Sequence, residues 1–240
     1  MKKNKIKDTG LEVTELSFGT SSLGSMPDTY GYEVPEQRAQ ETLKRFFQGP
    51  VNMLDTSRNY AMGESEKRIG IAIKENGGWP ENFILSTKID RNMETLVLDK
   101  KRTRESIEES LKTLNVDSVD ILFLHDPEYV KDVNDVTKKD GALDELFKIK
   151  EEGLAKAVGL AMGKINIMFP ILKNWDFDVI INHNRYTLLN READEMYSYA
   201  HSKNISIFNA APYAGGILAK GPSNFKNCLL YTSPSPRDPV

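Results

Sequence analysis

The sequence predicts an α/β fold in which seven short apolar strands alternate with helices, as in a (β/α)8 barrel. The strands lie roughly 22 to 37 residues apart, the length of one strand and one helix. Several are continuous apolar runs, which are typical of parallel strands covered on both faces. A doubly wound sheet would alternate in the same way, but no Gly-x-Gly-x-x-Gly follows the first strand, so the barrel is favoured. The predicted strands are Leu16–Phe18, Met53–Leu54, Phe83–Thr87, Val119–Leu124, Ala157–Leu160, Val179–Ile181 and Ile205–Phe208.

A short β-hairpin is predicted ahead of the first of these strands. Its arms, Lys5–Lys7 and Leu11–Val13, flank the turn residues Asp8–Gly10. We expect this hairpin to close the floor of the barrel.

Amphipathic helices are predicted in the gaps between the strands. Pro35 suits the start of the first helix, Asp99 is a candidate N-cap of the third, and Gly153 ends the fourth. The fifth helix, around Lys164–Lys173, is expected to be weaker because Pro170 interrupts it. The apolar stripes of the other five are Ala39, Leu43, Phe46 and Phe47; Ile69, Ala72 and Ile73; Ile107, Leu111 and Leu114; Leu143, Leu146 and Phe147; and Ala193, Met196, Tyr197 and Ala200.

The last residues of the chain differ in composition from the rest. Three prolines fall in the last seven residues, no helix is predicted after the seventh strand, and no eighth βα unit appears. We therefore expect residues 1–227 to form a barrel domain that lacks its last βα unit. Residues 228–240 are expected to be a tail that is not native to the protein or is disordered.

The composition excludes several functional classes. The chain has 240 residues with 32 Lys and Arg against 35 Asp and Glu, a net charge of −3, which gives no sign of binding to nucleic acid or a membrane surface. No apolar run approaches the ~18 residues of a membrane span, and the basic start is not a secretory signal. One cysteine, Cys228, excludes an intramolecular disulfide, and no side-chain cluster has metal-ligand spacing. We expect a soluble cytoplasmic protein without a metal.

Four polar residues lie at or just after the ends of predicted strands: Asp55, Tyr60, Lys88 and His125. Strand ends on one rim of a parallel barrel converge, so these side chains are expected to meet. A phenol has a pKa of about 10, which a nearby ammonium lowers. Lys88 could do this for Tyr60, and Asp55 could keep Lys88 charged. With His125 holding a carbonyl oxygen, Tyr60 could protonate that oxygen as hydride reaches the carbon.

Each of these four residues alone has a simpler explanation. The acid is more often a loop cap, the phenol a rim aromatic, the amine solvated, and the imidazole a core histidine bonded to a backbone carbonyl. Their joint pattern favours the proton-transfer site. Glu64 and Glu66 are expected to stabilise a helix N-terminus rather than to act in catalysis.

The motifs around these positions fall in a defined order. They are Gly19-Thr20, Asp55-Thr56-Ser57 with Tyr60, Gly63-Glu64-Ser65-Glu66 with Gly70, Ser86-Thr87-Lys88 and Leu124-His125. In this order and spacing the chain resembles the aldo-keto reductase family over roughly residues 5 to 226. The resemblance implies a (β/α)8 barrel, NADP or NAD across its carboxyl rim, and a catalytic tetrad of Asp55, Tyr60, Lys88 and His125. It also implies an oxidoreductase that interconverts a carbonyl and an alcohol.

Two later segments, 184–189 and 209–218, resemble the aldose (fucose, threo-aldose, galactose) and pyridoxal dehydrogenase branch of this family. The resemblance implies an aldose 1-dehydrogenase or aldehyde reductase that acts on a small sugar or aldehyde. Gly215 and Gly216 could let the backbone approach the cofactor's pyrophosphate. The residues expected to bind the cofactor are Gly19, Thr20, Asp55, His183, Ala211, Pro212 and Tyr213.

The chain departs from the family pattern at several cofactor contacts. Ala161 and Met162 stand where many members have Ser-Asn to hold the carboxamide, His183 replaces a common glutamine, and Ala210 replaces a stacking tyrosine. These departures leave the hydride chemistry intact and affect only the detailed cofactor contacts. A separate alternative function is a non-catalytic regulatory protein that binds a nicotinamide cofactor on the same barrel, because a fold does not fix a function. The intact tetrad argues against this alternative.

Overall fold

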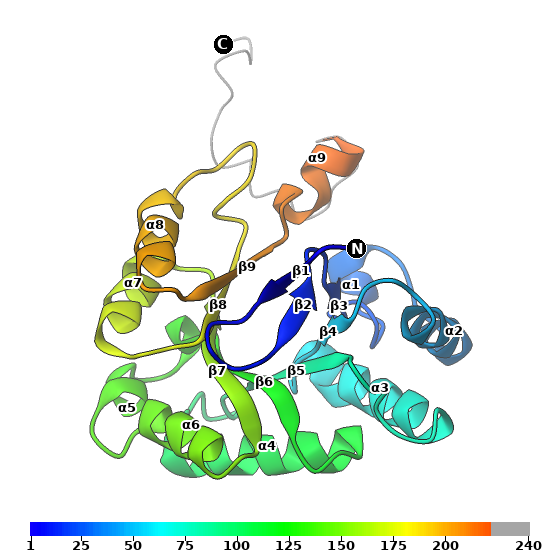
Figure 1. Cartoon of the computed structure of the whole chain (residues 1–240), viewed down its shortest axis with the longest axis horizontal. Helices are drawn as coiled ribbons and strands as arrows, with labels where there is room; N and C mark the ends of the chain where they lie inside the picture. The colour runs from blue at the N-terminus through cyan, green and yellow to red at the C-terminus, as the bar shows by residue number, and fades with distance from the viewer. Residues whose placement is uncertain (222–240) are drawn as a thin grey trace.

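The computed structural model describes residues 1–221, which form a curled sheet of seven parallel strands covered by helices (Figure 1). The strands follow one another in sequence order from β3 to β9, and every neighbouring pair is parallel. Within the described residues β3 and β9 have one sheet neighbour each, so the barrel is open between them. The predicted incomplete α/β barrel is confirmed. The expectation for residues 228–240 lies outside the described residues.

The elements alternate as predicted. The strands are β1 Lys3–Lys5, β2 Glu12–Thr14, β3 Phe18–Gly19, β4 Met53–Asp55, β5 Ile84–Ile89, β6 Val119–His125, β7 Ala155–Met162, β8 Val179–His183 and β9 Ser206–Ala210. The helices are α1 Pro27–Tyr30, α2 Glu36–Phe47, α3 Glu64–Glu75, α4 Lys100–Leu114, α5 Asn134–Thr137, α6 Ala142–Glu151, α7 Ile165–Asn174, α8 Asp194–Ser202 and α9 Ile217–Lys220. Single turns of 3-10 helix lie at Tyr60–Gly63, Pro127–Tyr129 and Ala214–Gly216.

Local signals explain how two of these helices begin and continue. Asp99 caps α4, where its side chain accepts a 2.8 Å hydrogen bond from the backbone N–H of Arg102, as predicted. Pro170 does not interrupt α7, contrary to expectation, and the helix runs through it. The burial of Met168 and Leu172 against the core outweighs the hydrogen bond that a proline removes.

Two apolar layers hold the barrel together, one on each face of the sheet. Successive strand residues point to opposite faces, so Leu122 and Leu124 of β6 pack under the helices. Ile121 and Phe123 point into the barrel, where they join a separate apolar cluster. This arrangement is the physical reason for the continuous apolar runs in the sequence.

The N-terminal hairpin closes the barrel floor, as expected. β1 and β2 pair antiparallel with Lys3 opposite Thr14, and they lie across the opening of the sheet (Figure 1). The loop between the strands is longer than predicted, and it places Ile6 and Leu11 in the apolar cluster inside the barrel. Burial of these two side chains fixes the hairpin against the strands.

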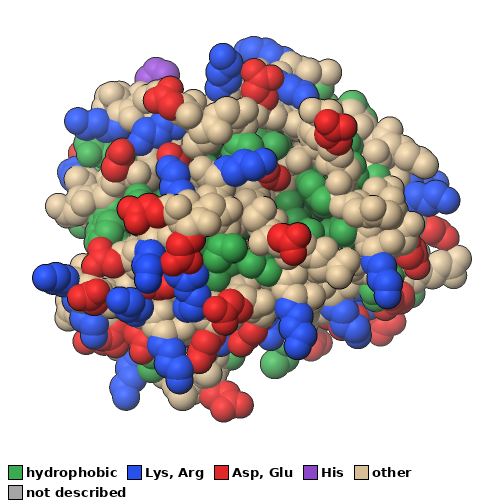
Figure 2. All heavy atoms as spheres, turned by 60° about the horizontal axis from the view of Figure 1, so that its bottom comes forward, with side chains coloured by type: hydrophobic (Ala, Val, Ile, Leu, Met, Phe, Trp, Pro, Cys, Tyr) green, Lys and Arg blue, Asp and Glu red, His purple; other side chains and the backbone are tan. Residues whose placement is uncertain are grey.

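Charges of both signs are interspersed on the face that includes α4 and α6 (Figure 2). Arg104 of α4, for example, forms ion pairs with Glu145 and Glu152. Within residues 1–221 we find no helix of sufficient length and apolar character to cross a membrane.

Candidate active site

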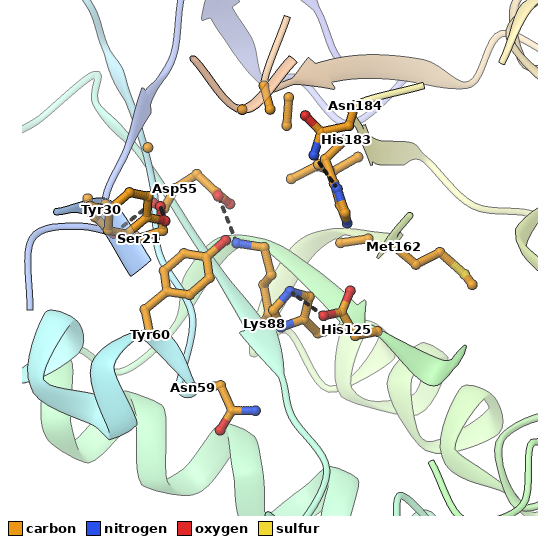
Figure 3. A pocket seen from close by; sticks show the side chains of 18 of the residues that line it. Ser21, Tyr30, Asp55, Asn59, Tyr60, Lys88, His125, Met162, His183 and Asn184 are labelled. Atoms are coloured by element: carbon orange, nitrogen blue, oxygen red, sulfur yellow. Dashed lines mark hydrogen bonds and ion pairs between the residues drawn. The ribbon is translucent and has the colours of Figure 1, made fainter. Parts of the chain in front are cut away.

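Three of the predicted catalytic residues come from neighbouring strands, the fourth comes from a loop, and all four meet at the carboxyl ends of those strands (Figure 3). Asp55 ends β4, Lys88 is the second-last residue of β5, and His125 ends β6. Tyr60 lies in the loop after β4. All four line one cavity of about 620 Å³, so the structure brings together residues that are far apart in the sequence.

Lys88 is held as a buried ammonium beside Asp55. Its side chain is 2% exposed, and Nζ lies 2.7 Å from Oδ2 of Asp55. Nζ also donates to the backbone oxygen of Thr56 at 2.6 Å, and the hydroxyl of Ser86 donates to Oδ1 of Asp55 at 3.0 Å. Burial works against the charge on Lys88, but Asp55 and Tyr60 together outweigh it, so the pKa of Lys88 lies above its ordinary value. Lys88 therefore carries its positive charge at neutral pH.

Tyr60 keeps its proton in this cavity. Its hydroxyl points toward Lys88 and Asp55 (Figure 3), and Nζ of Lys88 lies 4.6 Å from the centre of its ring. Burial raises the pKa of Tyr60 to about 12, although Lys88 acts in the opposite direction. The expectation of a lowered pKa is wrong for this structure because burial is the larger effect. A protonated phenol is nevertheless the state that a proton donor requires.

The loop that carries Tyr60 has an unusual backbone. Ala61 and Met62 have φ angles of 51° and 55°, in the left-handed region that side chains disfavour. Gly63 follows at φ 95°, and a Cβ atom there would lie 2.4 Å from the guanidinium of Arg58. Such conformations occur at functional sites when the surroundings hold them. Here the loop places Tyr60 over the strand ends just before α3 begins.

His125 is paired with a carboxylate that the sequence analysis did not single out. Its Nδ1 lies 2.7 Å from Oδ1 of Asp90, the residue after β5. Burial disfavours the charged ring, but Asp90, with a smaller contribution from Asp126, outweighs it, so the pKa of His125 lies above its ordinary value. The ring of Tyr60 stands nearly perpendicular to the imidazole at 5.9 Å between centres. Asp90 follows Lys88 by two residues, so the strand period of two could have placed it on the same face.

The cavity also contains most of the residues predicted to bind a cofactor. Pro212 is exposed and is not part of the lining. The hydroxyl of Thr20 has a structural role, because it donates to the backbone oxygen of Asp55 at 2.9 Å. The predicted cofactor residues that line the cavity are Gly19, Thr20, Asp55, His183, Ala211 and Tyr213.

The polar groups on the wall opposite Tyr60 fit the nicotinamide group of NAD or NADP (Figure 3). Oδ1 of Asn184 is buried and has no hydrogen-bond partner among the described residues, while its Nδ2 lies 3.2 Å from Nδ1 of His183. A buried unpaired oxygen of this kind suits the N–H of a carboxamide. Ala161 and Ala210 leave room for a flat ring. Among residues 1–221 we find no group of three His, Cys or acidic residues that could hold a metal ion.

Residues 15–227 match the sequence model of a protein family described as "Aldo/keto reductase family". The chain belongs to the aldo/keto reductase family. This aldo/keto reductase chain is 32% identical to the L-galactose dehydrogenase of Arabidopsis thaliana, over 89% of this chain and 66% of that protein. It is 27% identical to the D-threo-aldose 1-dehydrogenase of a Pseudomonas species, over 88% of this chain and 69% of that protein.

A solved structure gives the same result for the fold. The aldo-keto reductase of Bacillus halodurans, in its holo form, matches with a TM-score of 0.76 and 26% identity, over 92% of this chain and 70% of that chain. The aldo/keto reductase chain described here spans about two thirds of the length of the curated relatives named above.

Proposed function

We propose that the protein is an NAD(P)-dependent oxidoreductase that interconverts a carbonyl and an alcohol, with an aldose or small aldehyde as substrate. The observation that carries this proposal is the convergence of Tyr60, Lys88, Asp55 and His125 on one wall of the cavity. The aldose class is supported by the two relatives that are named as aldose or galactose dehydrogenases. For an aldose, oxidation at the anomeric carbon gives the lactone.

Tyr60 is proposed as the proton donor in the direction of reduction. The cofactor supplies the hydride for the carbonyl carbon. The oxygen then gains the basicity of an alkoxide, which is a stronger base than a phenolate, so the proton of Tyr60 moves to it. In the direction of oxidation the same oxygen of Tyr60 takes the proton back.

Lys88 and Asp55 are proposed to stabilise the phenolate that remains. The ammonium of Lys88 is already in place before the reaction, so no solvent has to reorganise when charge develops on Tyr60. Asp55 holds that ammonium through a 2.7 Å contact. His125 is proposed to donate to the substrate oxygen and to orient it toward Tyr60.

The opposite wall of the cavity is proposed to hold the cofactor. Asn184 and His183 would bind the carboxamide in place of the Ser-Asn pair that many family members use. Ala211 and Tyr213 would contact the same group from the segment after β9.

Turnover with a substrate panel tests this proposal. The purified protein is mixed with NADH or NADPH and a series of aldehydes, and with NAD or NADP and a series of aldoses, while nicotinamide absorbance is followed. We expect oxidation of at least one aldose. Cofactor binding, seen by fluorescence, without turnover of any substrate would contradict this function and favour the regulatory alternative; absence of both would contradict both.

A further inference from the structure

Asp90 is a buried carboxylate to which the reaction proposed above gives no role. Asp90 directly follows β5, and its side chain is 1% exposed. Its N–H donates to the hydroxyl of Ser106 at 3.0 Å, and its backbone oxygen accepts from Arg102 at 3.2 Å, both in α4. The pairing of β5 with β6 ends with Ile89 opposite Leu124, so Asp90 and His125 are the next residues along the two neighbouring chains. The backbone of Asp90 is therefore fixed where its side chain faces the site.

The carboxylate of Asp90 joins two parts of the site. Oδ1 lies 2.7 Å from Nδ1 of His125. Oδ2 accepts from the hydroxyl of Ser57 at 2.6 Å and from the backbone N–H of Asn59 at 3.0 Å. Asn59 directly precedes Tyr60, so the same carboxylate holds the imidazole and the start of the tyrosine loop.

The hydrogen bonds of Asp90 determine which nitrogen of His125 carries a hydrogen. His125 and Ser57 hold the pKa of Asp90 below its ordinary value despite its burial, so Asp90 is ionised at neutral pH and can only accept. Nδ1 of His125 must then be a donor. In a neutral ring with hydrogen on Nδ1, Nε2 has a free lone pair and accepts; it donates only when the ring carries a second proton.

We propose that Asp90 is a positioning residue that fixes hydrogen on Nδ1 of His125, so that Nε2 donates to a substrate oxygen only when the ring is an imidazolium. This inference rests on the oxidoreductase function proposed above. Reduction of a carbonyl then requires charged His125, and its rate falls as the pH rises through the titration of that ring.

Other charged groups act on the same ring. Oδ2 of Asp126 lies 3.7 Å from Nε2 and favours the second proton, whereas Lys88 and the burial of the ring oppose it. Asp90 is the nearer of the two carboxylates and touches the nitrogen that faces away from Asp126. The titratable groups around the ring are Tyr60, Lys88, Asp90, Asp126 and His183.

The test is a pH titration of His125 in the wild-type protein and in Asp90→Asn. Proton–nitrogen NMR of the imidazole rings monitors the titration. The chain has three histidines, so their signals can be assigned by substitution of His183 and His201. Asparagine keeps an oxygen for Nδ1–H and removes the charge. We expect the pKa of His125 to fall by about one to two pH units, with the Nδ1–H form kept in the neutral ring. The pH–rate profile of carbonyl reduction has an alkaline limb, and the pKa of that limb should fall by the same amount.

Asp120→Asn is the matched control. Asp120 is also a buried carboxylate, held by Leu85 N–H at 2.9 Å and by Lys156, but it lies near the start of β6, about 16 Å along the strand from His125. The control should leave the His125 titration unchanged. Equal shifts in both variants, or none in Asp90→Asn, would overturn the proposal.

The wild-type protein alone also provides a test. Hydrogen on Nε2 in the neutral form of His125 would overturn the proposal even if no variant folds. The NMR result is independent of turnover, so a protein without activity would contradict the oxidoreductase function and leave the role of Asp90 to be decided by the titration.

Discussion

Lys88 has an environment that an isolated ammonium could not tolerate. It is almost fully buried, and without a partner the low-dielectric surroundings would favour the neutral amine over the ammonium. Asp55 and the backbone oxygen of Thr56 supply that partner. The sequence order of the motifs could indicate this pair, because strand ends converge in a barrel, but the extent of burial could not be known before the packing was known.

Asp55→Asn should show what the pair contributes. Because the negative charge is lost, the pKa of Lys88 should fall and turnover should fall at least about tenfold. The free energy of unfolding should fall by about 3 kcal/mol, since a buried charge loses its partner. Denaturant unfolding and nicotinamide absorbance measure the two effects.

The ion pair between the exposed Asp176 and the half-buried Lys7 provides the control. Asp176→Asn should lower the free energy of unfolding by less than about 1 kcal/mol, because solvent screens the exposed carboxylate. Equal losses in the two variants would contradict the account of Lys88.

Glu66 lies in the first turn of α3, where it was predicted to stabilise the helix N-terminus. It is also fully buried, and the hydroxyl of Thr87 donates to its Oε1 at 2.6 Å. Burial raises its pKa to about 7. Distance from a helix end can be read from sequence; the direction in which a first-turn side chain points cannot.

Glu66→Gln should therefore change how stability depends on pH. The folded-state pKa lies above the unfolded value of 4.5, so folding favours the protonated acid, and wild-type stability is lost as the pH rises through about 7. Glutamine does not titrate. Relative to wild type, the variant should gain up to about 3 kcal/mol between pH 5 and pH 8. A stability difference that is the same at both pH values, or an equal pH-dependent gain in the exposed control Glu75→Gln, would contradict this.

At the scale of elements, α3 and α4 approach each other closely at Gly70. A Cβ atom at this position would lie 2.1 Å from the backbone oxygen of Thr113, near the end of α4. The glycine is required by space, since backbone atoms cannot rotate away as a side chain can. This contact helps to fix α3, which begins immediately after the Tyr60 loop.

Gly70→Ala should lower the free energy of unfolding by about 1–3 kcal/mol, because the two helices must separate to admit a methyl group. Alanine is otherwise the better helix former, so a stabilising effect would show that the helices are not in close contact. Lys74→Ala, at an exposed position of the same helix, should change stability by less than about 0.5 kcal/mol. Thermal unfolding measures both.

The strands could be predicted because each needs only a short apolar run between polar loops. Each of the seven predicted strands overlaps an observed one, and the two-sided burial follows from the composition of β6. The predictions for Pro170 and for the hairpin were less accurate, because core contacts decide whether α7 continues and where the hairpin strands pair. Those contacts involve residues far apart in sequence.

At the scale of the whole molecule, the cavity has two walls with different origins. β4, β5 and β6 carry the proposed proton-transfer residues, and β8, β9 and the segment after β9 carry the proposed cofactor contacts. Motif order was sufficient for the first wall. It was not sufficient for Asp90 or Asn184, because the importance of each depends on the atoms that its side chain reaches. The upward pKa shift of Tyr60 was missed for the same reason.

The most direct test of the central claim is to measure turnover and cofactor binding together in Tyr60→Phe. The substitution removes one hydroxyl and keeps the ring beside Lys88 and His125. We predict that cofactor affinity, measured by fluorescence titration, stays within about threefold of wild type while kcat falls at least about a hundredfold. Turnover equal to that of the wild-type protein would contradict the assignment of Tyr60 as the proton donor and, with it, the proposed use of this site.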